Sequence, residues 1–476
     1  MNNQEKRPLG PSHWELYKML EVNNFISMYT KKAEVEKTNI AKSGSKGALD
    51  RENNAWTVVK GPKLSVFETP HNIFAKSMRL VIILGQFLGL NPLMGILQND
   101  FRKMKFKFVS WQMLYSLFIC SYQVTKMISV LFLMSNSIGI NIAYINLFLF
   151  AATTSFNTII FIFIARKWPT VMKQITYCKL DEYIDQRVIF RSTVITIAIV
   201  IVGPIECALN QLALYTHILD CTPREMIDDP FRMLMMKKDN WIFDAEHVPY
   251  SFPLGIIIQV FNLIMSLNWS YPDIFISCIC LYLVSIFDKI NEKIDFALDK
   301  SLESWFWRSV REDYTQATRL VRMFDEVLSG ITFVSLANHL FCICLQVYNI
   351  LQISVKGGTK QKFPLKGCPN YPSGIFNGNE YTLYLACSIF LLVFRFLSVC
   401  LIGSRVHSAA TQPSIALHGV PTKFYCTEIQ RFIEQIHSDD IALSGLQFFN
   451  ITRSLILPVA GTIITYELVL LQFNDE

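Results

Sequence analysis

The sequence predicts an all-α membrane protein, a bundle of seven transmembrane helices whose N-terminus lies inside the cell. Of its 476 residues, 51% are hydrophobic and only 17% are charged, whereas a typical soluble domain is about 25% charged. The mean hydropathy is +0.31. The hydrophobic residues lie in long blocks, several of which approach or exceed the roughly 20 residues that cross a bilayer core. A soluble fold of this length would need more polar surface.

Seven hydrophobic blocks are expected to cross the membrane. The fourth block is too long for a simple crossing and contains Pro272, so we expect one kinked span there. We expect the fifth helix to begin in the cytoplasm, near Arg311, and to enter the membrane near Leu328. The predicted spans are residues 111–134, 142–165, 188–216, 252–288, 328–354, 380–403 and 452–473.

The first segments of the chain are ambiguous. Residues 1–72 are polar and show no signal peptide, so we expect a cytoplasmic tail. Residues 73–110 are expected to form an interfacial pre-helix and a basic segment. The hydrophobic part, residues 73–97, either spans the membrane or lies at its surface, and this choice sets the orientation of everything that follows.

Positive charge favours the second alternative. With residues 73–97 outside the bilayer and an inside N-terminus, the predicted cytoplasmic loops hold 19 Lys and Arg residues and the outside loops hold eight. Basic residues concentrate on the cytoplasmic side of membrane proteins. The sequence therefore predicts seven spans and an outside C-terminus, an orientation opposite to that of G-protein-coupled receptors.

This topology divides the chain into functional regions. Residues 111–403 contain spans one to six, residues 404–451 form a cytoplasmic anchor region, and residues 452–476 form the last helix. The extracellular loops are residues 217–251 and 355–379, and a cytoplasmic helical extension covers residues 289–327.

The predicted outside loops contain two cysteines. Cys221 and Cys368 lie in the two polar outside loops, where they could form a disulfide or stay unpaired.

The sequence contains no phosphate-binding loop, no HExxH and no nucleophile elbow, and no Cys/His set typical of a metal site. We therefore expect neither an enzyme nor a cofactor, and no nucleic-acid partner.

Polar residues inside the spans are the candidates for a ligand pocket, because an ionisable group there is costly and faces a cavity or a partner by default. Aromatic rings can stack on the apolar face of a sugar, while carboxylates, amides and imidazole can bind its hydroxyls. The alternative is that these residues hold helices together. The candidates are Glu206, Asn210, Trp269, Asp273, His339, Gln346 and Tyr384.

The last span carries the candidate pore. Thr465, Val469 and Gln472 share one stripe of a helix, with Leu468 beside it. Such a stripe can line a symmetric pore, in which an apolar ring closes the path and an amide ring contacts the ion. Taken alone, the stripe fits packing against a neighbouring helix better.

Several motifs resemble insect gustatory receptors of the sugar-sensing group. The C-terminal Thr465-Tyr466, five residues, and Gln472-Phe473 match the TYhhhhhQF signature of that family. The stretch from Ser444 to Glu467 resembles the sugar receptors in particular. Further matches are Gly89-Leu-Asn-Pro-Leu-Met-Gly95, Ala165-Arg-Lys-Trp-Pro169 and Asp273-Ile-Phe-Ile-Ser277.

The resemblance implies a channel. It implies a tetramer with one central pore, lined by the last helix of each subunit, and a sugar pocket in the outer half of each subunit. On this chain the pore or gate residues become Leu468, Val469, Gln472 and Phe473. The implied partners are a mono- or disaccharide, membrane lipid, related receptors, and permeant Na⁺, K⁺ and Ca²⁺.

We therefore expect a sugar-gated non-selective cation channel in the plasma membrane of chemosensory neurons. Three alternatives stay open: a metabotropic seven-span receptor, a sugar transporter, and a subunit that works only with a related co-receptor. Neither glycosylation sequon, Asn268-Trp-Ser270 or Asn450-Ile-Thr452, is expected to be modified, because each falls in the membrane or the cytoplasm.

Overall fold

The computed structural model describes residues 71–472, except residues 96–103, 137–141, 179, 181–183, 222–228, 240–241, 244–248, 299, 301 and 357–379. The predicted N-terminal tail, residues 1–72, therefore lies almost wholly outside the described residues. The described part is helical apart from two antiparallel pairs of two-residue strands, Leu93–Met94 (β1) with Lys105–Phe106 (β2) and Ser444–Gly445 (β3) with Phe449–Asn450 (β4).

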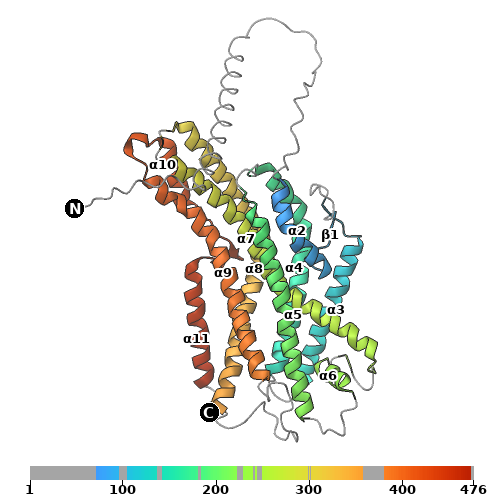
Figure 1. Cartoon of the computed structure of the whole chain (residues 1–476). Coiled ribbons are helices and arrows are strands. Elements are labelled where there is room, and N and C mark those ends of the chain that lie inside the picture. The colour runs from blue at the N-terminus through green and yellow to red at the C-terminus, as the bar shows by residue number, and fades with distance from the viewer. Residues whose placement is uncertain are drawn as a thin grey trace, which may run out of the picture. The chain divides into compact units, whose positions relative to one another are not determined.

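Long helices build the bundle (Figure 1). The α-helices are α2 (His71–Phe87), α3 (Trp111–Asn136), α4 (Ile142–Cys178), α5 (Arg187–Cys221), α6 (Pro230–Lys238), α7 (Phe252–Ala297), α8 (Ser304–Lys356), α9 (Glu380–His418), α10 (Thr427–Ser438) and α11 (Ile456–Gln472), and two short 3₁₀ helices are η4 (Thr422–Phe424) and η5 (Arg453–Leu455).

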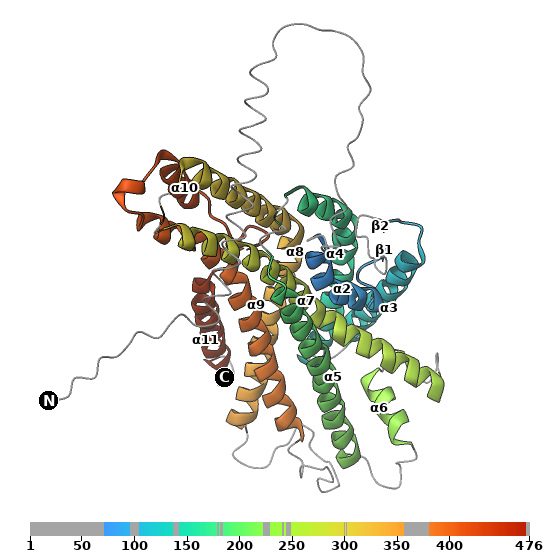
Figure 2. The same ribbon diagram turned by 45° about the horizontal axis from the view of Figure 1, so that its top comes forward.

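Helix α7 is the centre of the bundle. Every side chain from Ser270 to Phe287 is buried, and the main neighbours of α7 are α9, α5, α8, α4 and α2. Figure 2 shows α5, α8 and α9 around it. A helix that is apolar on all sides is stable only when other helices surround it. The helix stays continuous through Pro272, as expected for a single long element.

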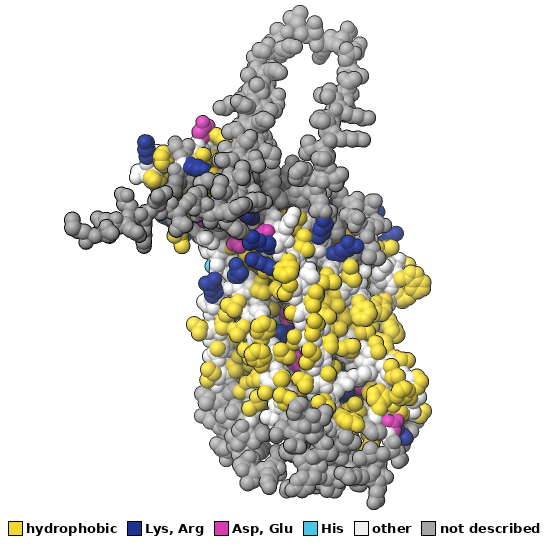
Figure 3. All heavy atoms as spheres, viewed as in Figure 1, with side chains coloured by type: hydrophobic (Ala, Val, Ile, Leu, Met, Phe, Trp, Pro, Cys, Tyr) yellow, Lys and Arg dark blue, Asp and Glu magenta, His cyan; other side chains and the backbone are white. Residues whose placement is uncertain are grey.

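Five of the described helices are long and apolar enough to cross a membrane: α3, α4, α5, α8 and α9. Figure 3 shows hydrophobic side chains over the middle of one face, with Lys and Arg gathered towards the end that carries α10. The chain is therefore a multi-pass membrane protein. The other two predicted spans correspond to α7 and to α11, which has 17 residues.

Helix α2 occupies most of the ambiguous segment 73–97, and it is not one of those five helices. It ends at Phe87, and Gly89 turns the chain with a positive φ of 73°. The Tyr271 hydroxyl on α7 accepts a hydrogen bond from the Asn91 amide at 2.5 Å and donates one to the Val81 carbonyl at 3.0 Å. These bonds dock α2 and its turn on α7.

Helix α10 caps the basic end of the bundle. Its buried residues Ile429, Phe432, Ile433 and Ile436 follow the i, i+3, i+4, i+7 spacing of one helix face. Arg311 on α8 forms an ion pair with Glu428 on α10 at 3.1 Å. The Tyr314 hydroxyl donates a hydrogen bond to the Ala410 carbonyl on α9 at 2.9 Å. Helices α8, α9 and α10 thus form one packed unit here.

We predict that Gly85→Ala weakens the docking of α2. A Cβ atom at Gly85 would overlap the Tyr271 hydroxyl and the Asn91 amide, and overpacking of this kind costs about 1–3 kcal/mol. The measurement is the unfolding temperature of the detergent-solubilised chain. Gly203→Ala on α5 is the matched control, because its Cβ would meet only Leu267 and Ser270 at 3.6 and 3.8 Å. Equal unfolding temperatures for the two variants would contradict this packing.

Candidate ligand-binding site

A cavity of about 400 Å³ lies among the helices α3 to α9, within the size range of small-molecule sites. Its wall combines aromatic, amide, hydroxyl and ionisable side chains. The lining residues are Lys126, Asn146, Leu147, Phe150, Glu206, Cys207, Asn210, Leu214, Lys238, Asn262, Ser266, Trp269, Asn338, Cys342, Leu345, Gln346, Tyr384 and Ser388.

Five of the seven candidate pocket residues line this one cavity. They come from four helices: α5, α7, α8 and α9. Glu206 and Asn210 are four apart on α5 and share one face, and tertiary packing brings the other three to the same cavity. These five residues are Glu206, Asn210, Trp269, Gln346 and Tyr384.

A hydrogen-bonded chain crosses the wall between α5, α9 and α8. Ser388 donates to a carboxylate oxygen of Glu206 at 2.6 Å, and the Gln346 amide nitrogen donates to Ser388 at 2.7 Å. The Gln346 amide oxygen and the indole nitrogen of Trp269 are buried and have no hydrogen-bond partner among the described residues. One acceptor and one donor at the cavity wall are therefore unsatisfied, which costs free energy until a partner binds.

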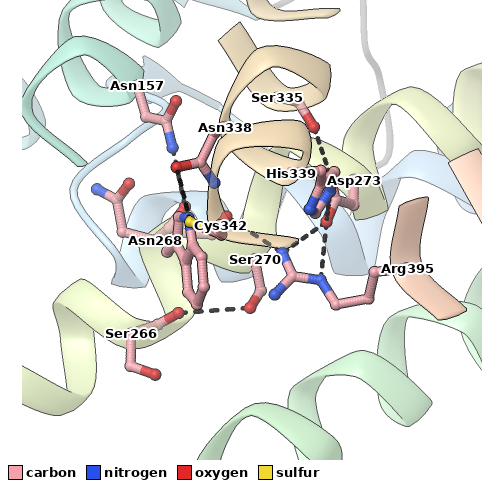
Figure 4. A network of polar contacts seen from close by, with 11 residues as sticks. Asn157, Ser266, Asn268, Ser270, Asp273, Ser335, Asn338, His339, Cys342 and Arg395 are labelled. Carbon is pink, nitrogen blue, oxygen red and sulfur yellow. Dashed lines mark hydrogen bonds and ion pairs between the residues drawn. The ribbon is translucent and has the colours of Figure 1, made fainter. Parts of the chain in front are cut away.

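Asp273 and His339, the other two candidates, do not line the cavity. Both belong to a buried network beside it (Figure 4). The Asp273 carboxylate accepts hydrogen bonds from Ser335 at 2.6 Å and from Arg395 at 2.9 and 2.5 Å. The Nε2 atom of His339 lies 3.1 Å from both Asp273 oxygens. The network joins α7, α8 and α9 at one level.

Arg395 was not among the predicted site residues, although the sequence carries a signal for it. Arg395 is the only charged residue from 381 to 403, and an ionisable residue inside a membrane helix is functional by default. Its side chain is 6% exposed. Its guanidinium carbon lies 5.2 Å from the centre of the Trp269 ring, so the charge network touches the cavity wall through this tryptophan.

Lys126 was missed in the same way. It is the only charged residue from 111 to 134, and it lines the cavity from α3. Its ammonium group lies 2.8 Å from the Asn262 amide oxygen and 3.5 Å from Asp239, which follows α6. The Asn262 amide nitrogen donates to Asp239 at 3.0 Å. The buried pair holds α6 against α3 and α7.

The structure also bears on Asn268, the first residue of one sequon. Its side chain is fully buried and its amide donates to Thr158 on α4 at 3.0 Å. A glycan cannot be attached to this side chain in the folded bundle.

Of the four pore candidates, the structure describes the side chain of Val469 alone. Val469 on α11 is 41% exposed. The side chains of Leu468 and Gln472, and all of Phe473, lie outside the described residues. The same holds for the side chain of Cys221 and for Cys368, so the disulfide and the pore lining stay predictions.

The fold resembles that of solved chemosensory receptors. The structure of the insect olfactory receptor OR5 from Machilis hrabei superposes with a TM-score of 0.58 at 14% sequence identity, covering 85% of this chain and 99% of that one. The structure of the same receptor in complex with eugenol gives a TM-score of 0.57 with the same coverage. The two chains therefore share an all-helical fold.

Sequence comparison gives the family. The Drosophila melanogaster protein "Gustatory receptor 5a for trehalose" is 27% identical, with 85% of this chain and 86% of that protein covered. "Gustatory receptor for sugar taste 64f" of the same fly is 26% identical, with 85% and 81% covered. The trehalose receptor family model matches residues 45–358 and 378–476. The chain belongs to this family of insect sugar gustatory receptors.

We predict that Lys126→Met lowers the stability of the folded chain, because the buried Asp239 carboxylate would keep its negative charge and lose its ion pair with Lys126. Breaking one partner of a buried pair costs about 3–5 kcal/mol, which a thermal unfolding series would detect. Lys167→Met is the matched control. Lys167 forms an ion pair with Glu326, and the two side chains are 53% and 76% exposed. Exposed ion pairs contribute about 0–1 kcal/mol to the stability of a fold.

Adding Asp239→Asn to Lys126→Met removes the second charge and should recover much of the lost stability. If Lys126→Met alone unfolds at the same temperature as the wild type, the buried ion pair does not stabilise the fold as described.

Proposed function

We propose that this chain is a sugar-gated, non-selective cation channel in the plasma membrane of chemosensory neurons. The observation that carries the proposal is the cavity, which combines an aromatic face with unsatisfied donor and acceptor atoms in a chain of the trehalose receptor family. The relatives named for trehalose and sugar taste support sugars as the ligand class.

The cavity chemistry suits a neutral polyol. The apolar face of a sugar ring stacks on Trp269, and its hydroxyls act as both donors and acceptors. They would donate to the Gln346 amide oxygen and accept from the Trp269 indole nitrogen. Lys126, Lys238 and Glu206 all line the cavity. The positive charge of Lys126 is balanced by Asp239, and that of Lys238 by Glu206. The formal charges cancel, so the site has no net preference for an ion.

Helix α11 supports assembly around a central pore. None of its described side chains is buried, and its main neighbours are α8 and η5. Leu457, Ile464 and Tyr466 are 78%, 61% and 60% exposed, so α11 presents an unpacked apolar surface that fits lipid or the helices of neighbouring subunits. We infer that four copies, or this chain with related receptors, surround the pore with α11.

The pore and topology follow from this assembly. Leu468 or Val469 would form the apolar gate, Gln472 would contact permeant Na⁺, K⁺ or Ca²⁺, and Phe473 would lie next to it. Helices α7 and α11 supply the two spans beyond the five, with an inside N-terminus and an outside C-terminus. The sugar binds the open state more tightly than the closed state and so shifts the population towards conduction.

Whole-cell recording from cells that express only this chain tests the proposal. Perfusion with mono- and disaccharides should evoke a rapid cation current that persists when G-protein signalling is blocked. Gln472→Ala should change the relative permeability of cations, while the sugar concentration for half-maximal current stays the same, because the pore and the cavity are separate sites.

Three results would redirect the proposal. A current abolished by blocking G-protein signalling would support a metabotropic receptor. A surface-expressed chain that conducts only when a related receptor is co-expressed would support an obligate subunit. Uptake of radiolabelled sugar without current would favour a transporter.

A further inference from the structure

The Arg395 side chain makes contacts that the ligand site does not use directly. Arg395 is absent from the cavity lining, yet its Nη2 atom lies 3.4 Å from the Trp269 carbonyl and its guanidinium lies over the Trp269 ring at 5.2 Å. Figure 4 shows the guanidinium beside Asp273. It therefore touches both the backbone and the ring of the cavity tryptophan.

Asp273 fixes the position of this guanidinium. The two charge-assisted hydrogen bonds from Nε and Nη2 converge on one carboxylate oxygen at 2.9 and 2.5 Å. Ser335 and His339 occupy the remaining acceptor positions. Because arginine stays protonated in proteins, the cation is permanent, and the buried carboxylate beside it leaves the guanidinium little freedom to move.

The tryptophan ring is held on two sides. The Phe150 ring meets it edge-on, with centroids 5.8 Å apart and an interplanar angle of 81°, and Arg395 adds a cation–π contact in a buried setting, where such contacts are strongest. A ring that is fixed before the ligand arrives loses less entropy on binding. Neighbouring side chains that hold a ligand-contacting residue in one conformation determine how precisely a binding site is formed.

We propose that Arg395 is a positioning residue for ligand binding: held by Asp273, it orients the Trp269 ring for stacking against the sugar. This inference rests on the proposed sugar site, but it assigns Asp273 and Arg395 a role different from direct ligand contact. The ligand affinity then depends on Arg395 only as long as residue 269 is a tryptophan.

A double-mutant cycle tests the proposal on the full-length chain in lipid nanodiscs. Dissociation constants for trehalose, sucrose and glucose come from the rise of the unfolding temperature with sugar concentration. Arg395→Lys keeps the charge and loses the fork geometry, so we expect a dissociation constant about tenfold higher for the sugar that binds wild type. In a Trp269→Leu background, the same change should have an effect below about twofold.

Two further variants keep the test informative. Arg311→Lys, which alters the ion pair with Glu428 far from the cavity, should leave the dissociation constant unchanged. If Arg395→Lys fails to fold, the pair Arg395→Met with Asp273→Asn removes both charges together, and its loss of affinity should likewise vanish in the Trp269→Leu background.

The outcomes separate the two proposals. An equal loss of affinity in the tryptophan and leucine backgrounds would mean that Arg395 acts on the fold or touches the sugar itself, and would overturn the positioning role. Full affinity in Arg395→Lys and in the paired variant would overturn it as well. If wild type binds none of the three sugars, the proposed sugar site fails and this inference fails with it.

Discussion

The buried ion pair between Asp273 and Arg395 is the constraint on which the bundle depends. It joins the central helix α7 to α9, and its hydrogen bonds to Ser335 and His339 add α8. A charge this deeply buried is stable only with a complete set of partners. The three helices must therefore meet at one level, and this fixes the spacing of the helices that enclose the cavity one turn away.

The same helices connect the cavity to the last helix. Helix α8 carries Gln346 at the cavity and is the main neighbour of α11. At the base of α11, Asp325 of α8 accepts hydrogen bonds from the backbone and side chain of Ser444 at 2.6 and 3.0 Å. The adjoining turn contains Leu446 and Gln447 with positive φ, a costly backbone state. Helix α8 therefore contacts both the cavity and the segment that leads into α11.

Much of the fold was predictable because long apolar helices leave a clear sequence pattern. Each predicted span lies within one helix, apart from the last, which begins in the loop before η5. The pattern of polar and aromatic residues within the spans also selected five residues that line one cavity. It could not separate Trp269 from Asp273, which share a helix face, because only tertiary packing decides which side chain meets the cavity and which meets Arg395. Arg395 and Lys126 were readable as lone charges in apolar spans, but their partners are distant in sequence.

An experimental structure of the full-length chain in lipid nanodiscs, with trehalose at saturating concentration, tests the sugar site and its support by Arg395 most directly. We expect ligand density in the cavity against Trp269, within hydrogen-bond distance of Gln346, with Arg395 still paired to Asp273. A well-defined cavity without density, or sugar bound to Asp273 in place of Arg395, would contradict it.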